Sequence, residues 1–353
     1  MSHRSVRNRN RNRNLFRSAL VAGAAATALV FSGCVAGEGQ AVEPETGASG
    51  ASGSLEGQTL NIDFATYNPL SLIIKDQGWL EATGLEVTWV QSAGSNKANE
   101  ALRAGAVDVG STAGSAALLA RSNGSPIQVI DIYSQPEWSA LVAPAGSSIT
   151  SVEDLRGKQV AATKGTDPYF FLLQSLEAGG LSPDDIVLQN LQHADGWAAL
   201  QNGSVDAWSG LDPIMAGAEE EGATLFFRNV DFNSYGFLNA TESFLAEKPD
   251  VAQAVVDAYE SARAWAAANP EETAEILAEV AGLDAAIATK VIVERSNLDV
   301  DPVPGDAQVE VLEKIGPIFV ELGDVATQQQ VDEALETLIN DEFVTQADPA
   351  RFD

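Results

Sequence analysis

The sequence has few of the residues that build several common kinds of site. Its 353 residues include one cysteine, two histidines and 20 lysines and arginines, against 50 aspartates and glutamates. A single cysteine excludes a disulfide scaffold, and together with two histidines it provides too few ligands for a Cys/His zinc site. The formal net charge of −30 disfavours binding to a nucleic-acid backbone, because no basic patch in the body of the chain offsets it. We therefore expect no metal site and no nucleic-acid partner.

Signatures of catalysis are also scarce. The chain contains neither a G-x-G-x-x-G fingerprint nor a P-loop, which are the usual motifs for nucleotide cofactors. A Ser/His/Asp arrangement would depend on His193, the only histidine in the body of the chain, and a cysteine nucleophile would have to be Cys34. We expect no catalytic residues and no cofactor.

The chain does have the material for a substantial core. Hydrophobic residues make up 45% of the sequence, and the mean hydropathy is −0.03, which is typical of a globular protein rather than a polytopic membrane protein. A chain of this length is expected to divide into two lobes.

The first 33 residues differ in charge from the rest. They hold six arginines and no acid, so the remaining chain has 14 basic against 50 acidic residues, a net charge of −36. The apolar run 18–31 is short for a bilayer span but typical of a signal peptide. It leads into Phe31-Ser32-Gly33-Cys34, which resembles a bacterial lipobox with Cys34 as the lipidated residue, although Phe31 replaces the usual aliphatic residue. The alternative is a membrane anchor with an incidental cysteine.

Residues 34–58 are mostly Gly, Ala, Ser and Glu, which predicts a flexible tether. From residue 59 short β-rich runs alternate with helical stretches, which predicts βαβ units and mainly parallel sheets. The expected strands are 60–65, 86–90, 107–110, 127–133, 159–162, 186–191, 205–208 and 224–227. Residues 242–341 are predicted to form consecutive helices that wrap the first lobe, with a helix start at Asn269-Pro270. The chain would then cross between the lobes near 141–146 and 228–240, which would form a hinge.

An internal repeat supports two lobes. Residues 101–108 (ALRAGAVD) and 199–206 (ALQNGSVD) match at five of eight positions. In each, a helix is expected to end at a glycine, Gly105 or Gly203, and a strand to begin at once.

The loops after the expected strands favour a ligand site. In parallel α/β sheets, ligands bind beyond the carboxyl ends of the strands, where helix N-termini present free N–H groups. These loops are rich in Ser, Thr, Gly and X-Pro, which suits hydrogen bonding to a small oxyanion; they are 66–69, 93–96, 111–115, 164–168 and 209–213. Helix capping alone also explains Asn68-Pro69, Asp167-Pro168 and Asp212-Pro213. Trp208 lies either in the core or along the cleft.

Three segments carry a family resemblance: DLRGK (154–158), KGT (164–166) and GSVDAW (203–208). With their surroundings in 59–240 they look like the aliphatic-sulfonate, taurine and nitrate family of ABC-importer binding proteins. The resemblance implies a type II, venus-flytrap periplasmic-binding-protein fold, α/β with a helical C-terminal block. The expected domains are a signal peptide (1–33), a tether (34–58), lobe one (59–143 plus 240–341), lobe two (144–238) and a tail (342–353).

By the same resemblance, the protein captures a small sulfonate-like solute and delivers it to an ABC permease driven by a cytoplasmic ATPase. It would be an exported monomer, lipid-anchored to the outer face of the cell membrane or periplasmic. Taurine, nitrate and a thiamine-pyrimidine precursor are alternative ligands. The same fold family includes a desulfinase and a thiamine-pyrimidine synthase, both of which depend on Cys and His. A purely structural lipoprotein would leave the repeated Ser/Thr/Gly loops unexplained.

The family's ligand contacts carry over to positions in the loops described above. They are Tyr67, Asn68, Ser95, Asn96, Thr112, Ala113, Gly114, Ser115, Gly165, Thr166, Trp208 and Asp212. One departure from the family pattern stands out, because Asp167 puts a carboxylate at the helix N-terminus that should receive an anion. Asp167 is therefore expected to turn away or to pair with Lys164, unless the ligand is less anionic than a plain sulfonate, such as zwitterionic taurine or an uncharged heterocycle.

Overall fold

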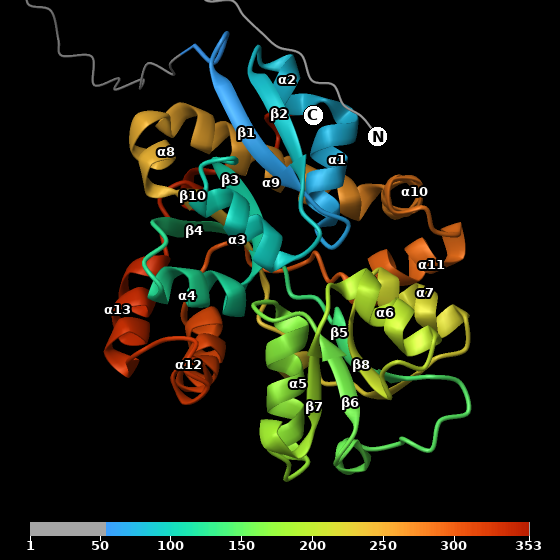
Figure 1. Cartoon of the computed structure of the whole chain (residues 1–353). Coiled ribbons are helices and arrows are strands. Elements are labelled where there is room, and N and C mark those ends of the chain that lie inside the picture. Colours follow the sequence, from blue (N-terminus) through green and yellow to red (C-terminus); the bar gives the residue numbers. More distant parts are fainter. Residues whose placement is uncertain (1–53, 353) are drawn as a thin grey trace, which may run out of the picture. The chain divides into compact units, whose positions relative to one another are not determined.

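The computed structural model describes residues 54–352. The predicted signal peptide, the lipidation site Cys34 and most of the predicted tether lie outside the described residues. The described part contains two five-stranded sheets with helices packed around them (Figure 1), as expected for a two-lobed α/β protein. None of the helices within residues 54–352 combines the length and the hydropathy that a membrane span requires.

The first sheet has the strand order β2-β1-β3-β10-β4. β1 runs parallel to β2 and β3, whereas β10 runs antiparallel to both β3 and β4. Its strands are β1 (Thr59–Phe64), β2 (Glu86–Gln91), β3 (Val109–Ala113), β4 (Ile127–Ser134) and β10 (Gly236–Thr241). The helices that follow these strands are α1 (Pro69–Gln77), α2 (Trp79–Ala82), α3 (Ser95–Arg103) and α4 (Gly114–Ser122). We call this sheet with α1 to α4 lobe one.

The second sheet repeats that arrangement with the order β7-β6-β8-β5-β9. β6 is parallel to β7 and β8, and β5 is antiparallel to β8 and β9. Its strands are β5 (Ser139–Ala143), β6 (Gln159–Ala162), β7 (Val187–Asn190), β8 (Ala207–Leu211) and β9 (Thr224–Phe227). Its helices are α5 (Asp167–Ala178), α6 (His193–Gln201) and α7 (Ile214–Glu220). We call this sheet with α5 to α7 lobe two.

Both sheets are mainly parallel, as expected, and each contains one antiparallel strand. The antiparallel member is β10 in lobe one and β5 in lobe two, and both lie at a point where the chain passes from one lobe to the other. A strand that arrives directly from the other lobe needs no crossover helix, so it can pair antiparallel. Neither strand was among those expected from the sequence.

The internal repeat corresponds to a structural repeat. Gly105 and Gly203 both have positive φ, +66° and +75°, where a glycine ends the helix without steric cost. The aspartate three residues later has the same role in each lobe, since Asp108 Oδ2 accepts from Asn61 N and Asp206 Oδ2 from Gln159 N, both at 2.8 Å. Each of these bonds ties the start of one strand to its parallel neighbour.

The C-terminal block is helical, as predicted. It contains α8 (Glu242–Glu247), α9 (Pro249–Ala268), α10 (Pro270–Ala281), α11 (Ala285–Lys290), the π-helix η4 (Val291–Arg295), α12 (Asp306–Glu321) and α13 (Gln328–Leu338). Asn269 is the N-cap of α10 with Pro270 at its first position, as the Asn-Pro pair indicated. The short 3-10 helices η1 (Val152–Leu155), η2 (Pro183–Asp185), η3 (Val230–Phe232) and η5 (Val344–Gln346) complete the described elements.

This block contacts both lobes, whereas the sequence suggested that it wraps lobe one alone. On one side Phe319 of α12 packs against Phe170 of α5, with ring centroids 4.8 Å apart. On the other side, one apolar cluster joins Leu72 of α1, Ala216 of α7 and Leu277 of α10. Figure 1 shows α11 beside α7, and α13 and α12 beside α4. The helical block therefore braces the lobes against each other.

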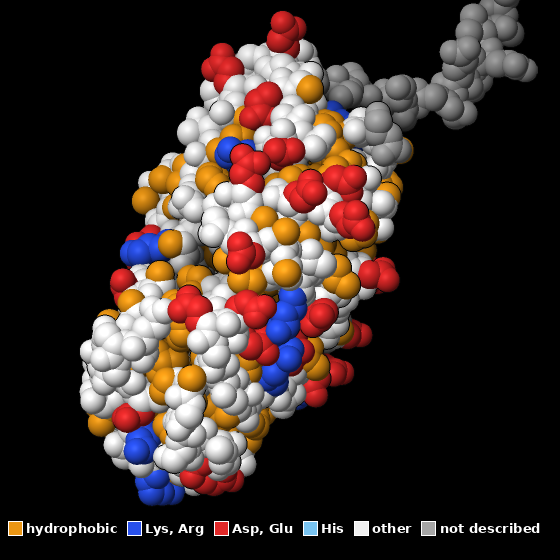
Figure 2. Space-filling view, turned by 90° about the vertical axis from the view of Figure 1, so that its right-hand side faces the viewer, with side chains coloured by type: hydrophobic (Ala, Val, Ile, Leu, Met, Phe, Trp, Pro, Cys, Tyr) orange, Lys and Arg blue, Asp and Glu red, His pale blue; other side chains and the backbone are white. Residues whose placement is uncertain are grey.

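The chain passes between the sheets at 135–138, after β4, and at 228–235, after β9. These two crossovers carry residues that matter for the site. β5 starts before the expected boundary at 143 and β10 before the one at 240; the exact lobe boundaries stay a prediction. The surface is acidic, and acidic side chains outnumber basic ones on the face in Figure 2.

Candidate functional site

The loops at the carboxyl ends of the parallel strands meet where the two lobes face each other. Three contacts carry this junction: a carboxylate–hydroxyl bond between α5 and α4, a close approach between α3 and α6, and a small cavity beside the crossovers. Each of the loops at 66–69, 93–96, 111–115, 164–168 and 209–213 contributes at least one residue to these contacts; that they bind a ligand stays a prediction.

The first contact is centred on Asp167, the first residue of α5. Its Oδ1 accepts from Ser115 Oγ at 2.8 Å and from Ser234 Oγ, while its Oδ2 accepts from Trp138 Nε1 at 2.8 Å and from Ser234 N at 2.9 Å. We call Ser115 Oγ, Ser234 Oγ, Ser234 N and Trp138 Nε1 the four-donor site. All the side chains involved are at most 3% exposed.

The four donors come from three separate segments of the chain. Ser115 lies in the first turn of α4 in lobe one, Trp138 on the first crossover and Ser234 on the second. Gly114 lets α4 approach the second crossover, because a Cβ there would lie 2.3 Å from the carbonyl oxygen of Ser234. Asp167 in lobe two is thereby bonded to lobe one and to both crossovers.

Every donor at this site is electrically neutral. Burial raises the pKa of the Asp167 carboxyl, while the bonds from Ser234, Trp138 and Ser115 oppose that shift. A Trp N–H and a backbone N–H can only donate, so the arrangement suits an ionised acceptor. Asp167 does not turn away, because it bonds within the interface. It does not pair with Lys164 either, whose ammonium lies over the Tyr169 ring at 5.6 Å. The third alternative, a ligand less anionic than a plain sulfonate, stays a prediction.

The second contact joins α3 of lobe one to α6 of lobe two. A Cβ at Gly94 would lie 2.9 Å from His193 Nε2 and 3.0 Å from Asn96 Oδ1, and one at Gly165 would lie 3.8 Å from Asn96 Cβ. His193 is 2% exposed, and burial lowers its pKa to about 4. His193 Nε2 and Asn96 Oδ1 have no hydrogen-bond partner. This half of the junction leaves buried polar atoms unsatisfied, unlike the four-donor site.

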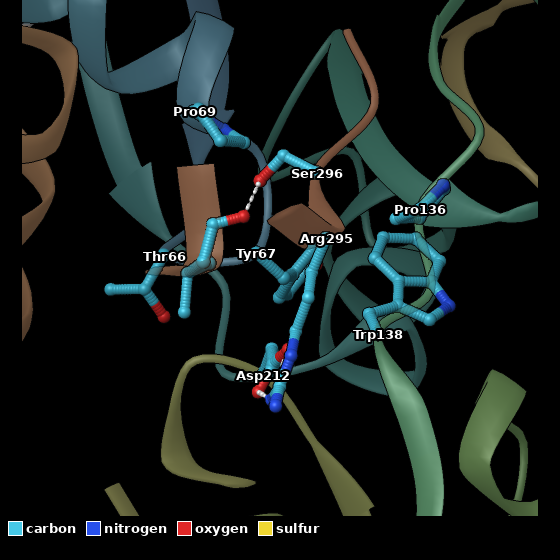
Figure 3. A pocket seen from close by; sticks show the side chains of 9 residues that line it. Thr66, Tyr67, Pro69, Pro136, Trp138, Asp212, Arg295 and Ser296 are labelled. Carbon is cyan, nitrogen blue, oxygen red and sulfur yellow. Dashed lines mark hydrogen bonds and ion pairs between the residues drawn. The ribbon is translucent and has the colours of Figure 1, made fainter. Parts of the chain in front are cut away.

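The third contact surrounds a small cavity (Figure 3). Its volume of about 10 Å³ is close to the minimum that a single water needs. The Trp138 ring packs edge-on against the Tyr67 ring, with centroids 6.0 Å apart, so the same indole that donates to Asp167 also lines the cavity. The lining residues are Thr66, Tyr67, Pro69, Pro136, Trp138, Asp212, Val291, Arg295 and Ser296.

A buried ion pair closes one side of this cavity. Arg295 of the π-helix η4, 2% exposed, donates through Nη1 to both oxygens of Asp212 at 3.2 and 3.3 Å and through Nη2 to Glu219 at 2.6 Å. Burial raises the pKa of Asp212 to about 6, with Arg295 opposing the shift. The side chains of Asp212 and Arg295 point toward each other in Figure 3, and they link the helical block to lobe two.

Five of the twelve predicted ligand residues lie at the junction. Ser115 belongs to the four-donor site, Asn96 and Gly165 meet across the lobes, and Tyr67 and Asp212 line the cavity. Whether each of them touches a solute stays a prediction.

The other predicted residues make bonds within their own lobe or at the adjacent crossover. Asn68 caps α1, and Ser95 Oγ accepts from Ala113 N at 2.9 Å. Thr112 Oγ1 accepts from Asn239 in the lobe-one sheet, Thr166 is the N-cap of α5, and Gly114 N bonds to the second crossover. Trp208 is fully buried against Trp197 in the lobe-two core, although its Nε1 has no partner.

Sequence reasoning missed Trp138, Ser234 and Arg295 as site residues. Trp138 was one of six tryptophans without a distinguishing pattern, and Ser234 and Arg295 belong to segments with no loop signature. For Trp138 and Ser234 the only signal was position, because they lie on segments between expected elements of different lobes. Among residues 54–352 no group of three or more His, Cys, Asp and Glu is arranged to hold a metal ion.

Comparison with known proteins finds binding proteins. The chain is 28% identical over 232 residues to a putative aliphatic sulfonates-binding protein of Escherichia coli K12, covering 65% of this chain and 72% of that protein. It is 29% identical over 256 residues to the protein of the same name from Bacillus subtilis 168, covering 70% of this chain and 77% of that protein.

Solved structures share the fold. The alkanesulfonate-binding protein SsuA from Xanthomonas axonopodis pv. citri, bound to MOPS, superposes with a TM-score of 0.72 at 24% identity over 81% of this chain and 99% of that one. The desulfurization enzyme DSZB has the same fold, with a TM-score of 0.62 at 16% identity over 82% of this chain and 98% of that one. The model of the NMT1/THI5-like family matches residues 70–273, well over half of the sequence. The chain belongs to the NMT1/THI5-like family.

Proposed function

We propose that this protein is the solute-binding component of an ABC importer and that it captures a small sulfonate-like solute between its two lobes. One observation carries the proposal: neutral hydroxyl and N–H donors from lobe one and both crossovers converge on the position of one buried oxyanion, the Asp167 carboxylate. Hydroxyl and N–H donors of this kind suit a sulfonate oxygen as well as a carboxylate. The names of the two sulfonates-binding relatives agree with this chemistry.

Closure of the lobes would be the signal that the permease reads. A solute that contacts both lobes only in the closed state favours that state by its differential affinity. The two crossovers are the natural hinge, since they alone join the sheets along the chain in residues 54–352. The helical block, which contacts α5 on one side and α7 on the other, would limit how far the lobes open.

We infer that the protein binds its solute without transforming it. The family enzymes to which the sequence was compared depend on Cys and His together. The only cysteine of this chain is Cys34, which precedes the described residues. His193 is buried, and its pKa of about 4 keeps the imidazole neutral at pH 7. The hydroxyl beside its Nδ1, Thr163 Oγ1 at 3.2 Å, donates to the Leu191 carbonyl oxygen at 2.7 Å. A desulfinase-like activity is the outcome that product analysis during a binding screen would reveal.

The site is proposed to work outside the cytoplasm. The arginine-rich leader, the apolar run and Cys34 support export with lipid anchoring at the outer face of the membrane. A strongly acidic surface keeps such a tethered receptor soluble. Replacing Cys34 by Ala should abolish labelling with a radioactive or clickable fatty acid and release the protein, and labelling that persists would refute the anchor.

A calorimetric titration of four solutes tests the ligand class. We expect saturable 1:1 binding of ethanesulfonate or taurine, and weaker or no binding of nitrate and an aminopyrimidine, because only the first two offer a tetrahedral oxyanion on an organic chain. Binding of nitrate or the pyrimidine alone would replace sulfonate by that alternative. No binding of any of the four would remove the proposed ligand class.

A further inference from the structure

The four-donor site is already occupied by a group of the chain itself. Asp167 accepts every donor of the site through its two carboxylate oxygens. A sulfonate bound at this site would use the same donors, since Ser115, Ser234 and Trp138 are buried and their donor groups are already bonded to Asp167. The chain therefore carries, at the interface of its lobes, a tethered equivalent of an anionic solute.

We propose that Asp167 is the specificity-determining residue of the solute site: it occupies the four-donor site and holds the lobes closed without solute, so that a sulfonate binds only by displacing it. This inference rests on the proposed function. The incoming anion has to replace the hydrogen bonds that Asp167 loses when it is displaced. Asp167 therefore lowers the affinity for every anion and favours solutes whose remaining parts make further contacts.

The geometry explains how the Asp167 side chain can both occupy the four-donor site and hold the lobes closed. Asp167 is fixed in lobe two as the first residue of α5, and Ser115 belongs to lobe one. Opening the lobes separates these two residues and exposes the carboxylate, and closing them restores the bond. Trp138 donates to Asp167 on one side and lines the small cavity on the other. Because that cavity has room for no more than about one water, a solute would reach the group it has to displace only when the lobes open.

The closely packed junction beside the site contains two buried polar atoms that a solute could bond once the lobes open. His193 Nε2 and Asn96 Oδ1 face Gly94 without partners, and unsatisfied buried polar atoms favour a ligand that can satisfy them. A solute with a second polar group would compensate for the displacement of Asp167 more fully than a bare alkanesulfonate, which we expect to bind the wild type more weakly.

Two measurements on the full chain test the inference. Calorimetry with ethanesulfonate compares the wild type with Asp167→Ser, which removes the carboxylate but keeps a small hydroxyl residue at the helix start. We expect the variant to bind about tenfold more tightly or better. Asp184→Ser is the matched control, since it removes an exposed acid of lobe two on η2, and its affinity should equal that of the wild type.

Hydrogen exchange measured by mass spectrometry shows whether the two lobes are closed. The amides of Gly114 and Ser115 donate to Ser234 of the second crossover, and the amide of Ser234 donates to Asp167. In the wild type they should be protected without solute, and ethanesulfonate should add little. In Asp167→Ser they should exchange faster without solute and regain protection when it is added.

The outcomes separate the inference from the proposed function. Equal exchange and equal sulfonate affinity in wild type and variant would overturn the role of Asp167 while leaving a sulfonate-binding protein. Faster exchange in the variant with no sulfonate binding by either protein would overturn the proposed function instead. Should Asp167→Ser fail to fold, the wild type decides alone: junction amides that are protected only after ethanesulfonate is added would refute closure by Asp167.

Discussion

Asp167 and Asp212 are two buried carboxylates of lobe two that differ in how they are held. Each follows a strand, β6 or β8, and each faces a segment outside its own lobe. Asp212 is paired with the guanidinium of Arg295, whereas Asp167 receives only neutral hydroxyl and N–H donors. A carboxylate with a fixed cation is part of a structural brace, since removing either partner leaves the other buried without a counter-charge. A carboxylate held by neutral donors is exchangeable, because another anion can use the same donors.

Removing the cation of the Arg295–Asp212 pair should have the largest effect on stability. We expect Arg295→Met to lower the free energy of unfolding by about 3–5 kcal/mol, because Asp212 would be left buried without a counter-charge. Lys290→Met is the control: Lys290 also pairs with Glu219, but both side chains are about one-third exposed, so the loss should be within about 1 kcal/mol. Urea unfolding at pH 8 measures both. Equal losses would mean that the Arg295 pair is no brace.

A third buried carboxylate, Asp63 of β1, has neither a cation nor a full set of donors. Its Oδ1 accepts from Ser111 N and Oγ, and its Oδ2 has no partner. Burial raises its pKa from 3.8 to about 7, so between these values the folded protein holds a proton that the unfolded chain has lost. Stability from this group is full below about pH 4 and is lost as pH rises through about 7, by up to about 4 kcal/mol.

Asp63→Asn should therefore gain stability relative to the wild type as pH rises. The two proteins are compared by urea unfolding at pH 4.5 and pH 8, and other titrating groups cancel in the difference. A gap that stays constant with pH would show that Asp63 is ionised in the folded protein and would place it with Asp167, as a carboxylate satisfied by neutral donors.

The smallest effect concerns a donor that serves both anions. Ser115 bonds to Asp167 before solute binds and, in our proposal, to the solute afterwards. Ser115→Ala should change ethanesulfonate affinity by less than about threefold in the wild type and weaken it about tenfold in Asp167→Ser. Calorimetry on the four proteins of this cycle measures the coupling. The same change in both backgrounds would mean that solute and Asp167 do not share this donor.

The sequence predicted the parts of the fold that local rules control. The glycines at 105 and 203 and the aspartates three residues later marked equivalent helix–strand junctions, and Asn269-Pro270 marked the start of α10. β5 and β10 escaped prediction. β5 is a run of five buried residues, SALVA, and a short apolar run without alternation does not distinguish a strand from a buried helix turn.

The site was predictable only in part. The carboxylate of Asp167 at a helix N-terminus was recognised from the Asp-Pro pair, because that position depends on α5 alone. Its partners Trp138 and Ser234 depend on how the crossovers return to the interface, which is a property of the tertiary fold. Arg295 lies 83 positions after Asp212 in the chain, and no local pattern indicates that the two would pair.

A crystal structure of Asp167→Ser with ethanesulfonate tests the central claim most directly. The account predicts that the sulfonate oxygens accept from Ser115 Oγ, Ser234 N and Trp138 Nε1, in place of the missing carboxylate and with the lobes closed. A sulfonate bound elsewhere in the closed interface, with the four donors bonded to water or to other protein groups, would contradict it.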